Sequence, residues 1–192
     1  MSIGLLGGSF NPAHGGHLAI SQVALRRLQL DCLWWLVSPG NPLKSNRELA
    51  PVETRLKQAA DVAQHPRIKV TGFERGLRDY YSRHTIAFLQ QRFPTTRFVW
   101  IMGADNLSGF HLWHDWQGAF SSLPIAVVDR PDYRLAGLAG RAAKTFEHAR
   151  IDETDAAGLT WLDAPVWTFL TLPLSPQSSS EIRGTKTKPK NR

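Results

Sequence analysis

Short apolar runs alternate with amphipathic runs along most of this chain, and this alternation constrains the fold more than any other feature. We expect the apolar runs to form strands at residues 3–6, 32–37, 67–71, 98–102, 125–128 and 166–172. Between them, apolar residues recur at helical spacing over 18–30, 52–64, 85–93, 113–120 and about 135–148. This order predicts an α/β fold, a doubly wound and mostly parallel sheet with helices on both faces. Ligands of such sheets bind at the carboxyl ends of the strands.

The length and the charge of the chain limit what else it can be. Its 192 residues fit one domain, expected over 1–184, followed by a basic tail at 185–192. The net charge is +7, and four basic residues lie in the last seven positions, so nucleic-acid binding by the fold itself is not expected. No apolar run approaches the roughly 18 residues of a membrane span. The single cysteine, Cys32, cannot form an internal disulfide, and we expect a cytoplasmic protein that does not bind membranes.

A glycine-rich stretch, GGSFNPAHGGHL at residues 7–18, joins the first expected strand to the first expected helix. Glycines let backbone N–H groups approach a ligand closely, and a helix start adds unpaired N–H donors with a partial positive charge. Together these features predict an anion site, most often one for phosphate. The stretch matches neither the dinucleotide-binding fingerprint, nor a P-loop, nor a nucleophile elbow.

Two histidines, His14 and His17, lie at the end of this stretch. The glycines and the helix start favour a role in contacting phosphate. Two alternatives stay open, a zinc pair and histidines that only cap the helix or face solvent. Zinc needs three or four protein ligands, and no further ligand has a suggestive spacing. A second pair, His111 and His114, raises the same metal alternative, which we do not favour.

A second motif lies near the end of the chain, where Ser178 and Glu181 have the spacing of a helix capping box. The glycine-rich stretch resembles the signature of the nucleotidyltransferase superfamily with the HxGH motif. Within it, the chain resembles the bacterial nicotinate-nucleotide adenylyltransferases, whose second signature, Ile-Ser-Ser-Thr-x-Ile-Arg, is similar to residues 177–183. The resemblance covers about residues 3–183. The chain departs from the family pattern at Gln177 and Ser180, and over residues 82–85.

The resemblance implies a Rossmann-like fold and transfer of the adenylyl group of ATP to nicotinate mononucleotide, with release of pyrophosphate, on the route to NAD. Such a reaction needs in-line positioning and neutralisation of charge on phosphoryl oxygens rather than a protein nucleophile. Mg²⁺ would be held mainly by the ATP phosphates and water, without metal ligands from the protein. A monomer or small homo-oligomer is expected. The alternatives are adenylyl or cytidylyl transfer to another phosphorylated acceptor, such as nicotinamide mononucleotide or phosphopantetheine, and a non-catalytic nucleotide sensor.

The resemblance also assigns roles to individual residues. It implies catalytic contacts to phosphate from His14, His17, Lys44 and Arg183. It implies ATP binding by Gly7, Gly8, Ser9, Phe10, Gly16, Gly103, Asp105, Ser179 and Ser180, and nicotinate mononucleotide binding by Thr85, Trp113 and Arg130. Plainer roles stay open for several of these residues: a solvated charge for Lys44, helix caps for Asp105 and the serines, and core packing for Trp113.

Overall fold

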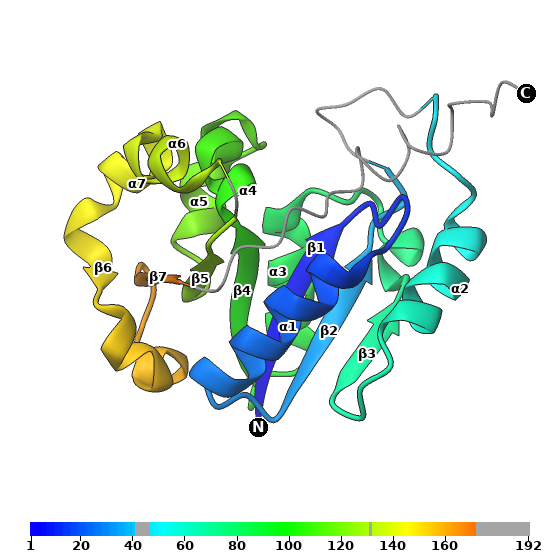
Figure 1. Cartoon of the computed structure of the whole chain (residues 1–192), viewed down its shortest axis with the longest axis horizontal. Coiled ribbons are helices and arrows are strands. Elements are labelled where there is room, and N and C mark those ends of the chain that lie inside the picture. Colours follow the sequence, from blue (N-terminus) through cyan, green and yellow to red (C-terminus); the bar gives the residue numbers. More distant parts are fainter. Residues whose placement is uncertain (41–46, 131, 172–192) are drawn as a thin grey trace, which may run out of the picture.

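A computed structural model of the chain describes residues 1–40, 47–130 and 132–171. Within these ranges, seven parallel strands form one sheet in the order β3-β2-β1-β4-β5-β7-β6 (Figure 1). The strands are β1 (Ser2–Gly8), β2 (Cys32–Val37), β3 (Ile68–Thr71), β4 (Arg97–Gly103), β5 (Ile125–Val128), β6 (Arg150–Ile151) and β7 (Trp167–Leu170). The chain builds outward from β1 to β3 and then returns to place β4 beside β1, so the expected doubly wound topology is confirmed. Its strand order reverses between β1 and β4, which is where such sheets bind ligands.

Helices cover both faces of the sheet. The α-helices are α1 (Gly15–Arg27), α2 (Val52–Val62), α3 (Ser82–Arg92), α4 (Ala104–Gly109), α5 (Trp116–Phe120), α6 (Arg134–Ala139) and α7 (Arg141–Thr145). Four 3₁₀ segments are described as well, η1 (Phe73–Gly76), η2 (Phe110–Leu112), η3 (Glu147–Ala149) and η4 (Glu153–Trp161). Residues of α1, α2 and η4 pack in one core layer, whereas residues of α3, α4, α5 and α7 pack in the other. In Figure 1, α1 lies in front of the sheet.

The central strands are apolar on both sides because both of their faces are buried. In β4, Trp100 and Met102 join one core layer, while Val99 and Ile101 join the other. This division follows from the pleat, which points successive side chains to opposite faces. A run of apolar residues without alternation is therefore what a doubly covered parallel strand requires.

The second half of the chain differs from the expected helices. Of the helix expected over 113–120, only α5 forms, because residues 113–115 are not helical. Two short elements that were not expected, α4 and η2, precede it, and Trp113 lies between η2 and α5. The helix expected over about 135–148 is divided by the extended backbone of Gly140 into α6 and α7. Elements of five or six residues are too short for a helical period to be visible in the sequence. The capped helix expected from Ser178 and the basic tail lie outside the described residues.

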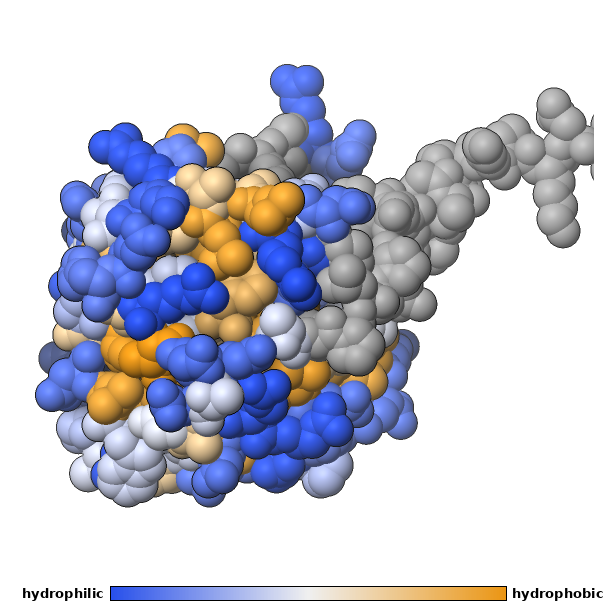
Figure 2. Space-filling view, turned by 60° about the vertical axis from the view of Figure 1, so that its left-hand side comes forward, coloured by the Kyte–Doolittle hydropathy of each residue, from blue (hydrophilic) through white to orange (hydrophobic). Residues whose placement is uncertain are grey.

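The surface on the side of α6 and α7 is mixed. Figure 2 brings this side forward and shows apolar areas lying between hydrophilic ones rather than covering the whole face. Leu135 of α6 is 82% exposed, and exposed apolar side chains are ordinary on a protein surface. No helix among the described residues is long and apolar enough to cross a membrane.

Candidate active site

His14 and His17 lie together at the start of α1, with ring centroids 4.0 Å apart. His14 caps the helix, because its Nδ1 accepts the N–H of Gly16 at 3.1 Å. The Nδ1 of His17 accepts the N–H of His14 at 3.2 Å, which completes a reciprocal capping box. A ring nitrogen that accepts a hydrogen bond carries no proton, so each neutral ring carries its proton on Nε2. The capping bonds thus set the tautomer of both histidines.

His17 is partly buried, and its surroundings keep its ring neutral. Burial lowers the pKa of His17 from 6.5 to about 3, and the electrostatic interactions with His14 and Arg130 act in the same direction. The backbone hydrogen bond from His14 has the opposite, weaker effect on this pKa. At neutral pH, His17 is therefore a hydrogen-bond donor through Nε2–H rather than a cation. Its electrostatic interaction with Arg130 also places the loop after β5 near the start of α1.

Arg130 and Asp105 form an ion pair between the loops that follow β5 and β4, with Nη1 2.5 Å from Oδ2. Asp105 Oδ1 is buried and has no hydrogen-bond partner among the described residues. A Cβ on Gly103 would lie only 2.4 Å from this oxygen, so the carboxylate position depends on the glycine. Asp129 fixes the base of the Arg130 loop, accepting the Arg130 N–H at 2.9 Å and Nε of Arg134 at 2.8 Å. The pair thus presents one buried acceptor oxygen at the edge where β4 ends.

The ring of Phe10 packs between Trp35 and His17. Phe10 is 1% exposed, and its ring centroid lies 5.0 Å from that of Trp35 and 4.7 Å from that of His17. Trp35 donates through Nε1 to Ser21 Oγ at 2.7 Å, and Ser21 donates to the His17 carbonyl at 2.8 Å. The contribution of Phe10 to a ligand site is thus limited to its backbone. Its φ of 46° is unusual for a residue other than glycine.

Thr85, expected on the acceptor side, is buried at the start of α3. Its hydroxyl donates to Glu74 Oε1 at 2.7 Å, and its N–H donates to the Tyr81 carbonyl at 3.0 Å. Both of its donors are therefore used inside the protein. Burial raises the pKa of Glu74, while hydrogen bonds from Thr85 and Ser38 oppose that rise. The His84 N–H also donates to the Tyr81 carbonyl, at 2.9 Å. The N–H groups of Ser82 and Arg83 are therefore the donors of the first turn of α3 that remain for an anion.

Trp113 lies near this turn and is half-buried. Its ring packs against Phe110 at 4.5 Å and edge-on to Trp100 at 6.3 Å between centroids. The next residue, His114, stacks on Tyr81 at 4.4 Å, which brings the Trp113 segment beside the start of α3. The fold thus joins the two regions expected to bind nicotinate mononucleotide. His111 and His114 belong to no cluster of three or more potential metal ligands in the described part of the chain.

The remaining expected residues divide into two groups. Gly7 and Gly8 end β1, Ser9 lies in the loop that follows, and Gly16 lies in the first turn of α1. Lys44, Ser179, Ser180 and Arg183 lie outside the described residues, so their roles stay predictions. The role of Asp129 in holding the Arg130 loop was not predicted from the sequence, because an aspartate directly after a strand is typical of an ordinary turn.

Comparison with known proteins identifies the family. The chain matches the cytidylyltransferase-like family over residues 5–185. It belongs to this family. A probable nicotinate-nucleotide adenylyltransferase of Mesorhizobium japonicum is 52% identical over 183 residues, covering 95% of this chain and 94% of that protein. The corresponding protein of Rhizobium meliloti is 50% identical over 186 residues, covering 97% and 99%. These matches confirm the resemblance drawn from the two motifs.

Solved structures of distant members share the fold. The nicotinic acid mononucleotide adenylyltransferase of Plasmodium falciparum, solved in complex with NaAD, superposes with a TM-score of 0.73 at 17% identity. That match covers 97% of this chain and 84% of the other. A putative nicotinate-nucleotide adenylyltransferase of Vibrio parahaemolyticus gives a TM-score of 0.55 at 14% identity, covering 77% and 79%. The cytidylyltransferase-like fold therefore extends over nearly the whole chain.

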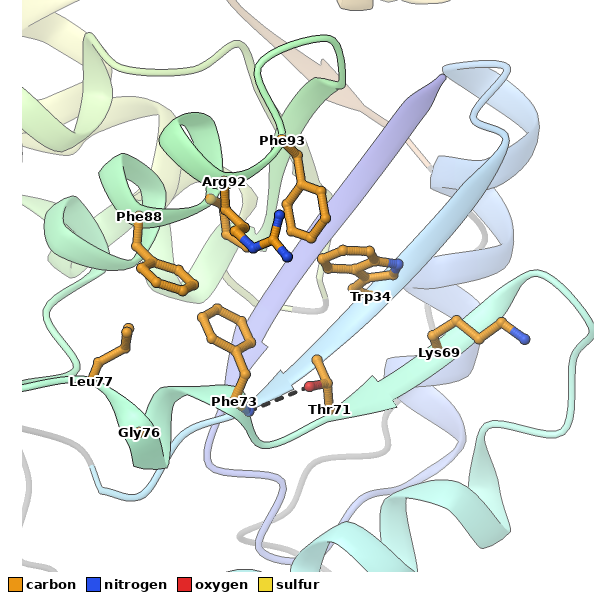
Figure 3. Close-up of a pocket in the computed structure, with 10 residues that line it drawn as sticks. Trp34, Lys69, Thr71, Phe73, Gly76, Leu77, Phe88, Arg92 and Phe93 are labelled. Atoms are coloured by element: carbon orange, nitrogen blue, oxygen red, sulfur yellow. Dashed lines mark hydrogen bonds between the residues drawn. The ribbon is translucent and has the colours of Figure 1, made fainter.

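A hollow of about 560 Å³ lies away from the histidines, between α3 and the outer strands β2 and β3 (Figure 3). Figure 3 shows Phe88 and Arg92 of α3, and Phe93 directly after this helix, beside Trp34 of β2 and Lys69 of β3. The lining is mainly aromatic and aliphatic, and it includes none of the residues expected to bind phosphate. The histidines at the start of α1 and the Arg130–Asp105 pair therefore lie outside this hollow.

Proposed function

We propose that this protein transfers the adenylyl group of ATP to nicotinate mononucleotide, giving nicotinate adenine dinucleotide and pyrophosphate. The observation that carries the proposal is the placement of His14 and His17 at the start of α1, beside the Arg130–Asp105 pair, where the strand order reverses. Relatives about half identical over nearly the full chain bear the name of this activity. We further propose that it acts in the cytoplasm as a monomer or small homo-oligomer.

The triphosphate of ATP would lie at the start of α1. An oxygen of the acceptor phosphate attacks the α-phosphorus, and the bond between that phosphorus and the bridging oxygen to the β-phosphate breaks. His17 enters this step neutral, with its proton on Nε2, and donates a hydrogen bond to a phosphoryl oxygen on which charge increases. Because this donor is fixed in place by its capping bond, it requires little reorganisation during the reaction.

Other groups supply positive charge and orientation. Arg130 is the cation of the described site that lies near His17, and Asp105 Oδ1 is a suitable acceptor for a ribose hydroxyl. By resemblance, Lys44, Ser179, Ser180 and Arg183 would also contact phosphate. Mg²⁺ would enter with ATP as part of the substrate complex and neutralise its phosphates, which suits a site that relies on few protein carboxylates.

The acceptor would lie between Trp113 and the first turn of α3. The half-buried indole offers a surface for the pyridine ring, and the helix start offers N–H groups to the carboxylate. In this arrangement, Thr85 acts by anchoring the turn through Glu74. Discrimination between nicotinate and nicotinamide would depend on these backbone donors.

The direct test is incubation of the purified protein with ATP, Mg²⁺ and nicotinate mononucleotide, with dinucleotide and pyrophosphate measured together. Nicotinamide mononucleotide and phosphopantetheine serve as competing acceptors in parallel reactions. We expect dinucleotide formation from nicotinate mononucleotide with the highest kcat/KM of the panel. Tight ATP binding without turnover on any acceptor would instead identify a nucleotide sensor and refute the proposal.

A further inference from the structure

Arg55 is a buried cation that has no carboxylate partner among residues 1–40, 47–130 and 132–171. It lies in the first turn of α2 and is 1% exposed. The carboxylate of the nearby Glu53 pairs instead with Arg75 at 2.7 Å, and Arg55 forms no ion pair within the described residues. Removing a guanidinium from water is costly, so a chain that buries one must satisfy its donors. The hydrogen-bond partners of the Arg55 guanidinium therefore indicate the role for which this arginine is buried.

The guanidinium donates to four backbone carbonyls from separate parts of the chain. Nη1 lies 2.6 Å from the Ser9 carbonyl and 2.7 Å from the Ser38 carbonyl. Nη2 lies 3.2 Å from the Pro39 carbonyl, and Nε lies 2.8 Å from the Ala50 carbonyl. Ser9 belongs to the glycine-rich loop, Ser38 and Pro39 follow β2, and Ala50 precedes α2. One side chain thus ties together two loops at the carboxyl edge of the sheet.

Asn11 adds a second connection between the same segments. Its Nδ2 donates to the Glu48 carbonyl at 3.0 Å, and its Oδ1 accepts the N–H of Ala50 at 3.2 Å. The glycine-rich loop is therefore fixed to residues 48–50 at two places, once through Arg55 and once through Asn11. Neither connection involves the histidines themselves.

The bond to Ser9 also determines where one N–H of the loop points. In a trans peptide the carbonyl and the following N–H point in opposite directions. Because the Ser9 carbonyl faces Arg55, the N–H of Phe10 faces away from it. This N–H makes no hydrogen bond with another described residue. The left-handed backbone of Phe10 is unfavourable for a residue with a side chain, so it persists only where its surroundings fix it.

We propose that Arg55 is a positioning residue for the triphosphate of ATP. This inference rests on the proposed function and extends it. Arg55 is too buried to touch the nucleotide, and it acts through the loop. Its hydrogen bonds hold the Ser9–Phe10 peptide so that the Phe10 N–H is presented to phosphate, and they fix the distance between the two loops. The positive charge of Arg55, which forms no ion pair with a described carboxylate, lies behind the loop and adds to the attraction for the anion.

The experiment compares Arg55→Lys and Arg55→Met with the unaltered protein. Inorganic tripolyphosphate serves as the probe, with binding measured by titration calorimetry, alongside kcat and KM for both substrates. Arg55→Lys keeps the charge but cannot reach four carbonyls at once. We expect it to weaken tripolyphosphate binding about tenfold and to raise the KM for ATP by a similar factor, with the KM for nicotinate mononucleotide changed less than twofold. If Arg55→Met folds, we expect it to lose more tripolyphosphate affinity than Arg55→Lys, because it lacks both the charge and the hydrogen-bond donors.

Two controls separate positioning from general stability. Ala59→Gly loosens the same helix without removing a bond of Arg55, and it costs about 1 kcal/mol by helix propensity. Arg67→Lys repeats the chemical change at the opposite end of the sheet, where Arg67 Nη1 donates to the Leu30 carbonyl at 3.1 Å. Both controls should lower thermal stability and leave tripolyphosphate affinity within twofold.

The outcomes are distinct. Unchanged tripolyphosphate affinity in Arg55→Lys would overturn the proposal, as would an equal loss of affinity in Ala59→Gly. Since the probe requires no acceptor, binding that depends on Arg55 in a protein that makes no dinucleotide would support the positioning role and refute the proposed function alone.

Discussion

The neutral state of His17 predicts that the unliganded protein loses stability as the pH falls. With a pKa of about 3 in the folded protein and 6.5 as the ordinary value, the unfolded chain binds a proton between these values that the folded protein excludes. The contribution of His17 to the free energy of unfolding is therefore at its maximum above pH 6.5 and decreases as the pH falls toward 3. At pH 5, about 1.5 units below the ordinary value, the loss is about 2 kcal/mol, because one unit corresponds to about 1.4 kcal/mol.

The assay is urea unfolding of the nucleotide-free protein at pH 7.5 and pH 5.0 at constant ionic strength. His17→Gln removes the titrating group, and the exposed His148 provides a matched control as His148→Gln. Between the two pH values, the unaltered protein and His148→Gln should lose about 2 kcal/mol more stability than His17→Gln. The packing change caused by the glutamine is present at both pH values and cancels in this difference. A difference below about 0.5 kcal/mol would refute the argument that burial keeps His17 neutral.

Four further substitutions test separate parts of the site. His17→Ala should lower kcat by about 10²- to 10³-fold while circular dichroism shows an intact fold, since it removes one fixed donor; near-normal turnover would exclude His17 from the reaction. Asp105→Asn should raise the KM for ATP about tenfold by weakening the pair with Arg130, measured by steady-state kinetics; an unchanged KM would contradict a role in nucleotide binding. Trp113→Ala should raise the KM for nicotinate mononucleotide about tenfold and leave that for ATP within twofold, through lost ring stacking; equal effects on both substrates would indicate a core role. Burial raises the pKa of Glu74, so its negative charge opposes folding above the ordinary value of 4.5. In urea unfolding, Glu74→Gln should therefore be more stable than the unaltered protein at pH 7.5, and this gain should shrink as the pH falls toward 4.5. A stability difference that does not depend on pH would contradict this explanation.

The strands and the glycine-rich loop before α1 could be predicted because each rests on local sequence. A buried parallel strand must be apolar throughout, and a glycine-rich turn before a helix is visible without knowledge of the fold. Arg55 could not be predicted in this way. An arginine on an amphipathic helix is normally expected to face solvent. Arg55 is buried because three segments that are separate in the sequence, the glycine-rich loop, the loop after β2 and the residues before α2, surround it in the fold. The same applies to Glu74, whose partner Thr85 lies on another helix.

The surroundings of the residues expected to bind the acceptor were harder to predict than the glycine-rich loop, for a related reason. Trp113 lies between short helical elements whose periods are not visible in the sequence, so its neighbours could not be inferred. Thr85 was expected to face the ligand, yet both of its donors bind within the protein. Side-chain type indicates which chemistry is available, whereas the direction of a hydroxyl depends on the surrounding packing.

The reciprocal cap at the start of α1 couples the protonation of the site to the integrity of the helix. The lone pair on Nδ1 of each histidine accepts a backbone N–H, so a proton or an alkylating reagent at that atom must displace the cap. Chemical modification at Nδ1 would therefore fray the first turn of α1 at the same time as it removes the histidine. Protonation of either histidine at Nδ1 therefore also removes the cap from the first turn of α1.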